Sequence, residues 1–422
     1  MSLPTPGGAP PPAPPALEPG RLRRTFSALR ERDFRLLWIS AFTSTSGTWM
    51  QAVAQSWVVL EMTGSAFWLG VDAFLATFPM ILFSLIGGAV ADRIERRRIL
   101  FWSQIFQMSF AFVLAALIFF GVVRVWHIFI LSFLTGTVQA FGGPAYQALL
   151  PLLVRREDVP NAVAMNSLQF NLARMLGPAL AGLALASLGA AACFLLNGLS
   201  FFAVIGALLA IRPGAMPGRE SPTTMLADIR EGLRFLERNP TIRQLTGIAF
   251  CATFFGIPLV TMLPVVAKSI FEMGATGYSM LMTAQGAGAV IGAFFVAGNT
   301  FRHGAGRASV WFMLAFATAL GVFAASRILP ISMIAIFIAG VTLMGVVTTV
   351  SSLVQLATPE MMRGRVMSIF MLAFRGGMPL GNLASGWGAE RFGVASALGF
   401  NAAVLFAISL LFLFGRNRVR DL

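Results

Sequence analysis

Charged residues are scarce in this sequence of 422 residues. They make up 11% of the chain, whereas hydrophobic residues make up 57%. A soluble domain carries about 25% charged residues, so this chain lacks the polar surface that it would need in water. The composition predicts an all-α integral membrane protein with the bilayer as its solvent.

Residue types that carry out catalysis or bind metals are also scarce. The sequence has two histidines and two cysteines. His127 and His303 lie at the ends of predicted spans on opposite faces of the membrane, and Cys193 and Cys251 lie in apolar runs, where buried thiols act as small hydrophobic groups. No metal-ligand spacing and no Gly-x-x-x-x-Gly-Lys phosphate loop occurs. We therefore expect no enzyme, no metal, no cofactor and no ATP-driven pump.

Acidic residues are the rarer charge, since 17 Asp and Glu stand against 31 Lys and Arg, a formal net charge of +14. In a soluble protein this excess would suggest nucleic acid. Here the basic residues lie in short loops, so membrane topology explains them and no nucleic-acid partner is expected. With the N-terminus in the cytoplasm, 25 basic residues fall on the cytoplasmic side and four on the other. This asymmetry predicts that both termini are cytoplasmic.

Twelve apolar runs are long enough to span a membrane, which needs about 20 residues. They form two groups of six, at 36–60, 66–91, 99–121, 125–149, 163–187 and 190–211, and at 244–267, 279–300, 308–326, 330–353, 366–389 and 394–415. We expect a disordered Pro-rich cytoplasmic tail with a basic juxtamembrane segment (1–33), an N-terminal six-helix bundle (34–211), a cytoplasmic linker with an amphipathic helix (212–243), a C-terminal six-helix bundle (244–415) and a basic cytoplasmic tail (416–422).

The two groups of spans share a pattern. In the fifth and the eleventh span a Ser, an Arg and a Pro are spaced by seven and four residues, and all three pairs are offset by 201 residues: Ser167, Arg174 and Pro178, and Ser368, Arg375 and Pro379. Charged residues inside a span are rare. The repeat predicts two pseudo-symmetric halves, an architecture found in secondary transporters.

The loop after the second span carries a motif. It reads Gly88-Ala-Val-Ala-Asp92-Arg93-Ile-Glu95-Arg96-Arg97. This resembles the signature of the major facilitator superfamily, Gly-x-x-x-Asp-Arg-x-Gly-Arg-Arg, with Glu95 in place of the second Gly. The resemblance implies twelve helices in two bundles and a gate in which Asp92 lies near the start of the eleventh helix, at the positive end of its dipole. The alternative is that the arginines only anchor the loop in the cytoplasm.

Three further stretches resemble the enterobactin-exporter and macrolide-efflux branch of that superfamily. They are Phe34-Arg35-Leu-Leu-Trp38, Pro144-Ala-Tyr146-Gln147-Ala-Leu-Leu-Pro151 and Asn171-Leu-Ala-Arg174-Met-Leu-Gly177-Pro178-Ala-Leu-Ala-Gly182. Gly177, Pro178 and Gly182 also resemble the helix-five motif of drug antiporters. The resemblance implies proton-driven export of a small molecule, a siderophore or a drug-like compound. We also expect a monomer surrounded by lipid in the bacterial cytoplasmic membrane.

Three charged residues lie inside spans. Arg174 and Arg375 lie near the midplane, where a charge is costly and usually functional. They can attract an anionic substrate, or they can bond to helix carbonyls or a buried acid and hold the halves in register. Asp72 is the only acid well inside a span, and Glu61 ends the first span on the same side. A desolvated carboxylate takes up protons more readily, so Asp72 with Glu61 can carry the coupling proton; alternatively, Asp72 reaches the outer water.

The first span carries a polar stripe, whose members are spaced four, three and four residues apart on one helical face. We expect this face to line a substrate cavity, and the alternative is hydrogen bonding between helices. The cavity candidates are Ser44, Thr48, Gln51 and Gln55, with Trp49 and, from the fourth span, Gln139.

Other functions stay open beside export. An importer, or a lipid or lysolipid transporter, can use the same fold, and so can a receptor or scaffold that transports nothing. The Asp92 motif and the charges inside the membrane favour transport.

Overall fold

The structure is a computed structural model that describes residues 26–211, 225–298 and 304–415. Within these ranges it does not describe the side chains of 84–93, 225–230 and 297–298. Residues 1–25 of the expected tail and juxtamembrane segment (1–33), the expected C-terminal tail (416–422) and the start of the expected linker (212–224) lie outside the described residues. In the described part of 1–33, Ser27–Arg30 forms a short 3₁₀ helix and α2 begins at Arg32.

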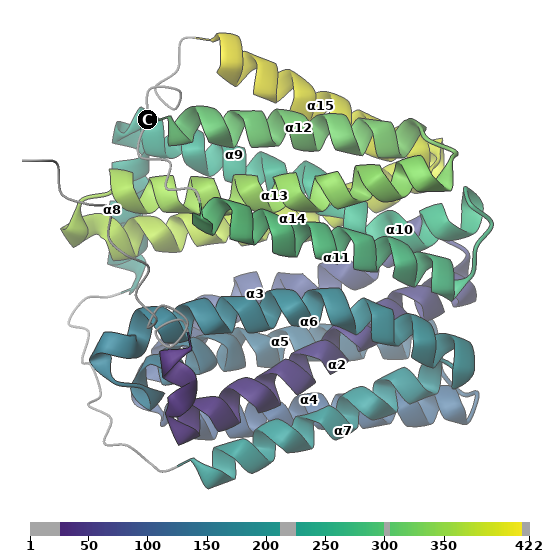
Figure 1. Cartoon of the computed structure of the whole chain (residues 1–422), viewed down its shortest axis with the longest axis horizontal. Helices are drawn as coiled ribbons and strands as arrows, with labels where there is room; N and C mark the ends of the chain where they lie inside the picture. Colours follow the sequence, from purple (N-terminus) through teal and green to yellow (C-terminus); the bar gives the residue numbers. More distant parts are fainter. Residues whose placement is uncertain (1–25, 212–224, 299–303, 416–422) are drawn as a thin grey trace, which may run out of the picture.

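The first half of the chain forms six long helices. They are α2 (Arg32–Thr63), α3 (Ala66–Arg93), α4 (Arg96–Phe119), α5 (Val125–Leu149), α6 (Val159–Ser187) and α7 (Ala190–Ala210). Short turns connect successive helices. Gly64 and Gly189 have φ values of 63° and 82° at two of these turns, a conformation that glycine adopts without a steric penalty. Successive helices therefore run antiparallel (Figure 1).

The second half contains a broken helix. Its helices are α9 (Pro240–Gly256), α10 (Pro258–Ser269), α11 (Ala275–Gly298), α12 (Ala305–Ala325), α13 (Leu329–Ala357), α14 (Glu360–Phe392) and α15 (Val394–Phe414). The run expected as one span at 244–267 is divided into α9 and α10 at Ile257. Pro258 has no backbone N–H and cannot continue the hydrogen bonding of α9, which explains the break.

Ten segments of the described chain are long and apolar enough to cross a membrane. They include every helix of the two halves except α2 and α6, with α9 and α10 counted as one segment. Helices α2 and α6 have 32 and 29 residues, but polar side chains such as Gln51, Gln55 and Arg174 interrupt their apolar runs. The expectation of an all-helical membrane protein is confirmed, and ten of the twelve expected spans qualify by length and composition.

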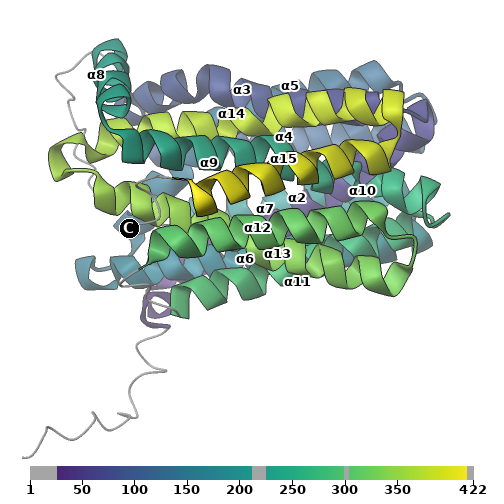
Figure 2. The ribbon, with the colours of Figure 1, turned by 90° about the horizontal axis from the view of Figure 1, so that it is seen from above.

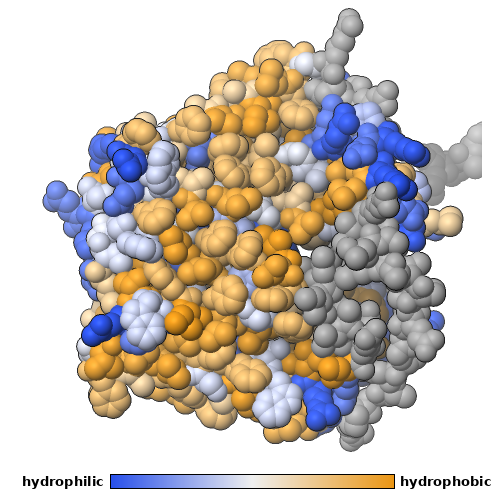
Figure 3. Space-filling model, turned by 180° about the vertical axis from the view of Figure 1, so that it is seen from behind, coloured by the Kyte–Doolittle hydropathy of each residue, from blue (hydrophilic) through white to orange (hydrophobic). Residues whose placement is uncertain are grey.

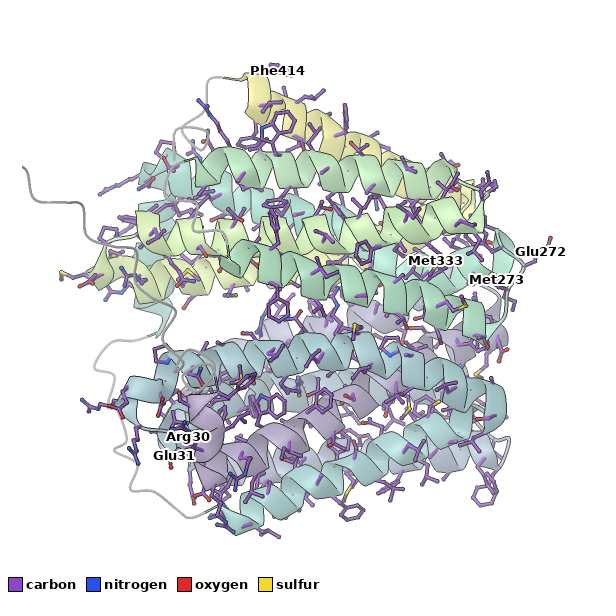
Figure 4. All side chains as sticks on the ribbon, in the orientation of Figure 1. Arg30, Glu31, Glu272, Met273, Met333 and Phe414 are labelled. Atoms are coloured by element: carbon purple, nitrogen blue, oxygen red, sulfur yellow. The ribbon has the colours of Figure 1, made fainter. Side chains whose placement is uncertain are left out.

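The molecule has an apolar belt between two polar ends (Figure 3). Helices α2, α4, α6 and α14 begin at the end that carries most of the arginines, among them Arg96, Arg155 and Arg363, and we call it the basic end (Figure 1). The opposite end, which carries Lys268 and Arg391, is called the far end. Arg30 and Glu31 lie at the basic end and Glu272 at the far end (Figure 4).

Helix α8 (Met225–Arg238) lies across the basic end, at a steep angle to the long helices (Figure 2). An ion pair of 2.9 Å joins Arg365 of α14 to Glu231 of α8. Gly232 is buried next to Ile369, where a Cβ would lie 2.5 Å from the Ile369 side chain. Helix α8 is therefore attached to the second half.

The two halves meet along two pairs of helices. Helices α2–α7 form one group and α9–α15 the other; α3 packs on α14, and α6 packs on α11 (Figure 1). These pairs form the walls of the interface in which Arg174 and Arg375 lie.

Candidate substrate site between the two halves

The halves touch closely at the far end. A Cβ on Gly70 of α3 would lie 2.5 Å from the carbonyl oxygen of Asn382 of α14, and a Cβ on Gly182 of α6 would lie 2.8 Å from the Ser279 side chain of α11. Such short distances leave no room for a larger side chain, because at these glycines the helix backbones pack closely together. Trp57 of α2 and Tyr278 of α11 also stack, with 6.3 Å between their ring centroids.

Burial falls along the interface face of α6 towards the basic end. Gly182 is buried, Met175 and Asn171 are half-buried, and Ala164 is exposed. Seven, four and seven residues separate these positions, which keeps them close to one helical face at 3.6 residues per turn. The face that packs on α11 at the far end is therefore uncovered at the basic end.

Helix α14 shows the same gradient against α3. Gly386 and Asn382 are buried, Arg375 is half-buried, and Ser368 is exposed. These residues are spaced four, seven and seven apart and again share a face. Both helix pairs diverge from the far end towards the basic end, so the interface is open at the basic end.

Arg174 lies where α6, α2 and α11 approach one another. Its Nη2 donates a hydrogen bond of 3.1 Å to Oε1 of Gln285 on α11, and its guanidinium carbon lies 5.7 Å from the ring centroid of Trp49 on α2. Phe170 packs edge-on against Trp49, with 6.1 Å between the ring centroids. Among the described side chains, no carboxylate pairs with Arg174, so its positive charge is met only by an amide oxygen and an aromatic face.

Gln285 is the partner that sequence reasoning missed. Its side chain is buried, with 1% exposure, and its Nε2 group has no hydrogen-bond partner among the described residues. A buried donor without a partner is costly, so a substrate acceptor that reached Nε2 would remove that cost. The only signal in the sequence was one polar residue within the small-residue run Ala284-Gln285-Gly286-Ala287-Gly288.

Arg375 occupies the position in α14 that Arg174 occupies in α6. It is half-buried, and no hydrogen bond or ion pair joins it to the described part of the chain. The expected alternative, in which the arginines bond to helix carbonyls or to a buried acid and hold the halves in register, is seen only in part: the Arg174–Gln285 bond joins the two halves, but no carbonyl or acid among the described residues bonds to either arginine. The two arginines remain candidates for binding substrate.

The four polar side chains of the α2 stripe have different partners and do not line one common cavity. Ser44 is buried, and Thr48 is exposed and donates to the carbonyl oxygen of Ser44 at 2.9 Å. Gln51 accepts a hydrogen bond of 2.6 Å from Nδ2 of Asn197 on α7. Hydrogen bonding between helices thus occupies Gln51, and the structure brings Trp49 to Arg174 instead.

Asp72 belongs to a buried cluster inside the first half. Its side chain is 6% exposed; Ser132 of α5 donates to Oδ1 at 2.5 Å, and Nε2 of Gln55 donates to Oδ2 at 2.8 Å. Gln55 also lies 2.9 Å from the Ser132 hydroxyl. Asp72 does not reach the outer water, so that alternative is wrong. Glu61 is exposed near the end of α2, and no hydrogen bond or ion pair joins it to Asp72 within the described residues.

Three of the remaining candidates, Gly177, Pro178 and Gly182, have packing roles, and the fourth, Gln139, does not. A Cβ on Gly177 would lie 2.4 Å from Cβ of Trp49, so this glycine makes the room that Trp49 needs. Pro178 is buried inside α6, and Gly182 lies in the contact with Ser279. Gln139 is exposed on α5, and none of the described residues shares a hydrogen bond with its side chain.

The loop motif is described in part. Arg96 donates to the carbonyl oxygen of Ala148 at 3.3 Å, and Arg97 donates to that of Leu209 at 3.4 Å. These bonds fix the start of α4 to the basic ends of α5 and α7. The side chains of Asp92 and Arg93 lie outside the described residues, and the surroundings of Gly88 are not described either.

Two of the three stretches that carried the branch resemblance, those at 34–38 and 144–151, meet at the basic end. Nε1 of Trp38 donates to the carbonyl oxygen of Met165 at 2.8 Å, and the Tyr146 hydroxyl donates to Oδ1 of Asn166 at 2.9 Å. Phe34 is buried in the same cluster. They join the ends of α2, α5 and α6, so their role in this structure is packing.

Comparisons with known proteins agree with this architecture. The family model for transmembrane secretion effectors matches residues 23–421. The chain is 30% identical to the multidrug efflux pump Tap of Mycolicibacterium fortuitum, over 89% of this chain and 92% of that protein. It is 25% identical to the staphyloferrin A transporter of Staphylococcus aureus, over 90% and 96%, and 27% identical to the enterobactin exporter EntS of Escherichia coli, over 92% and 93%.

A solved structure shares the fold. A single-residue variant of the nucleoside transporter NupG superposes with a TM-score of 0.75 at 11% identity, over 90% of this chain and 99% of that chain. The sequence motifs, the helix arrangement and the family match lead to one conclusion: the chain belongs to the transmembrane secretion effector family of the major facilitator superfamily and is a multi-pass membrane transporter, not an enzyme.

Proposed function

We propose that this protein exports a small anionic molecule across the bacterial cytoplasmic membrane by alternating access, coupled to protons. In this proposal α2 and α6 are spans, which brings the number to twelve, and the basic end faces the cytoplasm, as the excess of Lys and Arg requires. Both termini are then cytoplasmic, and the state described above opens to the cytoplasm.

The observation that carries the proposal is the unpaired charge of Arg174. A guanidinium held between Gln285 and Trp49, in an interface open at one end, needs an anion to complete its hydrogen bonding. Gln285 adds a free donor and Trp49 a flat apolar surface. Relatives named for staphyloferrin A and enterobactin support a siderophore-like cargo.

A cationic cargo is less favoured by the same geometry. The acid that would attract a cation, Asp72, is enclosed by Gln55 and Ser132 within the first half. A substrate in the interface between the halves cannot reach it without breaking that cluster.

The enclosure suits Asp72 for the proton instead. A buried carboxylate that accepts two hydrogen bonds can be neutralised by one proton, and its neutral form binds Ser132 of α5 and Gln55 of α2 less strongly than its charged form. Protonation would then be linked to the packing of the first half. Glu61, exposed near the end of α2, has no bond to Asp72 among the described residues, so in this proposal its part is to exchange protons with the water at the far end.

The cytoplasmic gate is proposed for Asp92. In the outward-open state its carboxylate would lie at the N-terminus of α14 and hold the basic end closed. The substitution Asp92→Asn should lower transport without loss of folded protein, whereas normal transport by this variant would contradict the gate.

The experiment for the proposed function is transport in proteoliposomes of known orientation. A proton gradient is applied, and anionic siderophores, macrolides and lipophilic cations are offered from the basic side. We expect gradient-dependent movement of the anionic compounds away from the basic side. Movement of cations alone would reject the anionic class, and movement in the opposite direction would reject export.

A further inference from the structure

A carboxylate from the second half is bound to the start of a helix in the first half. Oε2 of Glu390, in the last turn of α14, accepts hydrogen bonds from the Ser65 hydroxyl at 2.9 Å, from the Ala66 backbone N–H at 3.0 Å and from the Phe67 backbone N–H at 3.4 Å. Ala66 and Phe67 are the first two residues of α3.

The start of α3 needs such a partner. The first N–H groups of a helix have no acceptor within the helix, and the helix dipole makes this end positive. Helix α3 has no acidic residue of its own in the first turn. Ser65 precedes the helix, and its hydroxyl accepts from the Trp68 N–H at 3.5 Å. The negative charge that completes the cap comes from Glu390, on the other side of the interface.

This bond lies beside the tightest contact between the halves. Gly70 follows Ala66 by one turn, and Gly386 precedes Glu390 by one turn. A Cβ on Gly386 would lie 3.0 Å from the Ala66 carbonyl oxygen and 3.1 Å from Cα of Gly70. Opening the far end requires that α3 and α14 separate here, and the Glu390 cap is lost when they do.

We propose that Glu390 is a latch that closes the far end and thereby sets the balance between the state open at the basic end and the state open at the far end. The inference rests on the alternating access of the proposed function. Glu390 is a positioning residue, since it holds the halves and lies away from Arg174. Its side chain is exposed, so a neutral substitute leaves no buried gap and the variant is expected to fold.

The test measures opening of the far end directly. Ser279 on α11 is 2% exposed and sealed against Gly182, so a cysteine there reacts only when the halves part. In a chain with Cys193 and Cys251 replaced by alanine, S279C is labelled from the far side with a membrane-impermeant maleimide, without substrate. Loss of one charge at a helix N-terminus should raise the labelling rate of E390Q about fivefold. The variant S65A, which loses one of three donors, should show a smaller rise.

Glu272 provides a matched control. It is an exposed acid at the far end (Figure 4), and no hydrogen bond or ion pair joins it to the described residues. The variant E272Q changes the charge at the same end of the molecule and should leave the labelling rate as it is. A rate for E390Q equal to that of the parent, or an equal rise for E272Q, would overturn the latch.

A second measurement does not depend on the reporter at Ser279. Spin labels at L188C and I328C, exposed far-end positions in the two halves, report their separation, and E390Q should enlarge the long-distance population. An unchanged distribution in a folded protein counts against the latch. Neither readout uses substrate. If E390Q shifts the population towards the far-end-open state but the protein exports nothing, only the proposed function is rejected. If the protein exports its substrate but E390Q leaves that population unchanged, only the latch is rejected.

Discussion

Arg174 is the residue on which the proposed anionic substrate class rests. Its partners are Gln285 and Trp49, which come from different halves of the chain. A buried or half-buried cation without a carboxylate costs free energy, and a substrate anion would recover part of it. A neutral side chain would join the two helices at lower cost, which is why the proposed function assigns Arg174 to substrate binding.

Replacing Arg174 tests this role. We expect R174A to weaken binding of an anionic substrate by roughly 10- to 100-fold, the range for losing a hydrogen bond to a charged group. The conservative R174K keeps the charge but loses the planar fork, and we expect intermediate affinity. Binding is measured by calorimetry on purified protein.

The matched control for Arg174 is R307A. Arg307 is exposed at the start of α12, and its loss removes the same charge away from the interface. Equal weakening by R307A and R174A would mean that net charge alone attracts the substrate.

Asp72 carries the second prediction at this scale. D72N keeps the size of the side chain and can keep hydrogen bonds to Ser132 and Gln55, but it cannot take up a proton. We expect exchange of substrate between the two sides to continue, whereas accumulation driven by a proton gradient falls at least about tenfold. Both are measured in the same proteoliposomes. Full gradient-driven accumulation by D72N would remove Asp72 from the coupling.

Helix α14 contains neighbouring glycines with opposite surroundings. A Cβ on Gly377 would lie 2.2 Å from the Thr253 hydroxyl, and a Cβ on Gly381 would lie 2.0 Å from the carbonyl oxygen of Phe254. Nothing lies within 4 Å of a Cβ on Gly376. The face of α14 towards α9 is therefore packed backbone to backbone, while the adjacent position is open.

This difference predicts a stability order. We expect G381A and G377A to lower the free energy of unfolding by about 1–3 kcal/mol each, because the helices must move apart. G376A should raise it by up to about 1 kcal/mol, because alanine is the better helix former. Thermal unfolding in detergent measures all three, and equal melting temperatures for G376A and G381A would contradict the packing.

At the scale of the whole molecule, α3 and α14 form one pair with a carboxylate assigned to each end. Glu390 caps α3 at the far end, and Asp92 is proposed to cap α14 at the basic end. Both bonds cannot hold at once if the halves rock about the centre of the interface. The pair would then act as a two-position switch with opposite biases.

The switch makes a prediction for the combined variant. E390Q should favour opening at the far end and D92N opening at the basic end, so their effects should oppose each other. We expect the S279C labelling rate of the double variant to return to within about twofold of the parent. A double variant labelled as fast as E390Q alone, with D92N having no effect, would separate Asp92 from the switch.

The sequence by itself determined the membrane setting, the helical class, the division into halves and the family. These follow from local properties: the length of apolar runs, the spacing of residues in the fifth and eleventh spans, and a short loop motif. The two runs that fell below the composition limit, α2 and α6, did so because they carry polar residues: Gln51 and Gln55 bond within the first half, and Arg174 bonds across the interface. Pro258 also marks the break between α9 and α10 in the sequence. The apolar residues on both sides of it, however, look like one continuous span.

Only the tertiary structure decided which side chains meet. Gln285 joins Arg174 across 111 residues of chain, and Glu390 reaches Ala66 across 324. Helical periodicity places a residue on a face, but it does not say which helix covers that face or how far along its length. The stripe of α2 was therefore expected to line one cavity, whereas in the structure Gln51 bonds to Asn197 of α7 and Gln55 bonds to Asp72. Such pairings depend on how all the helices fit together, because each contact is settled by the shape and close packing of its neighbours.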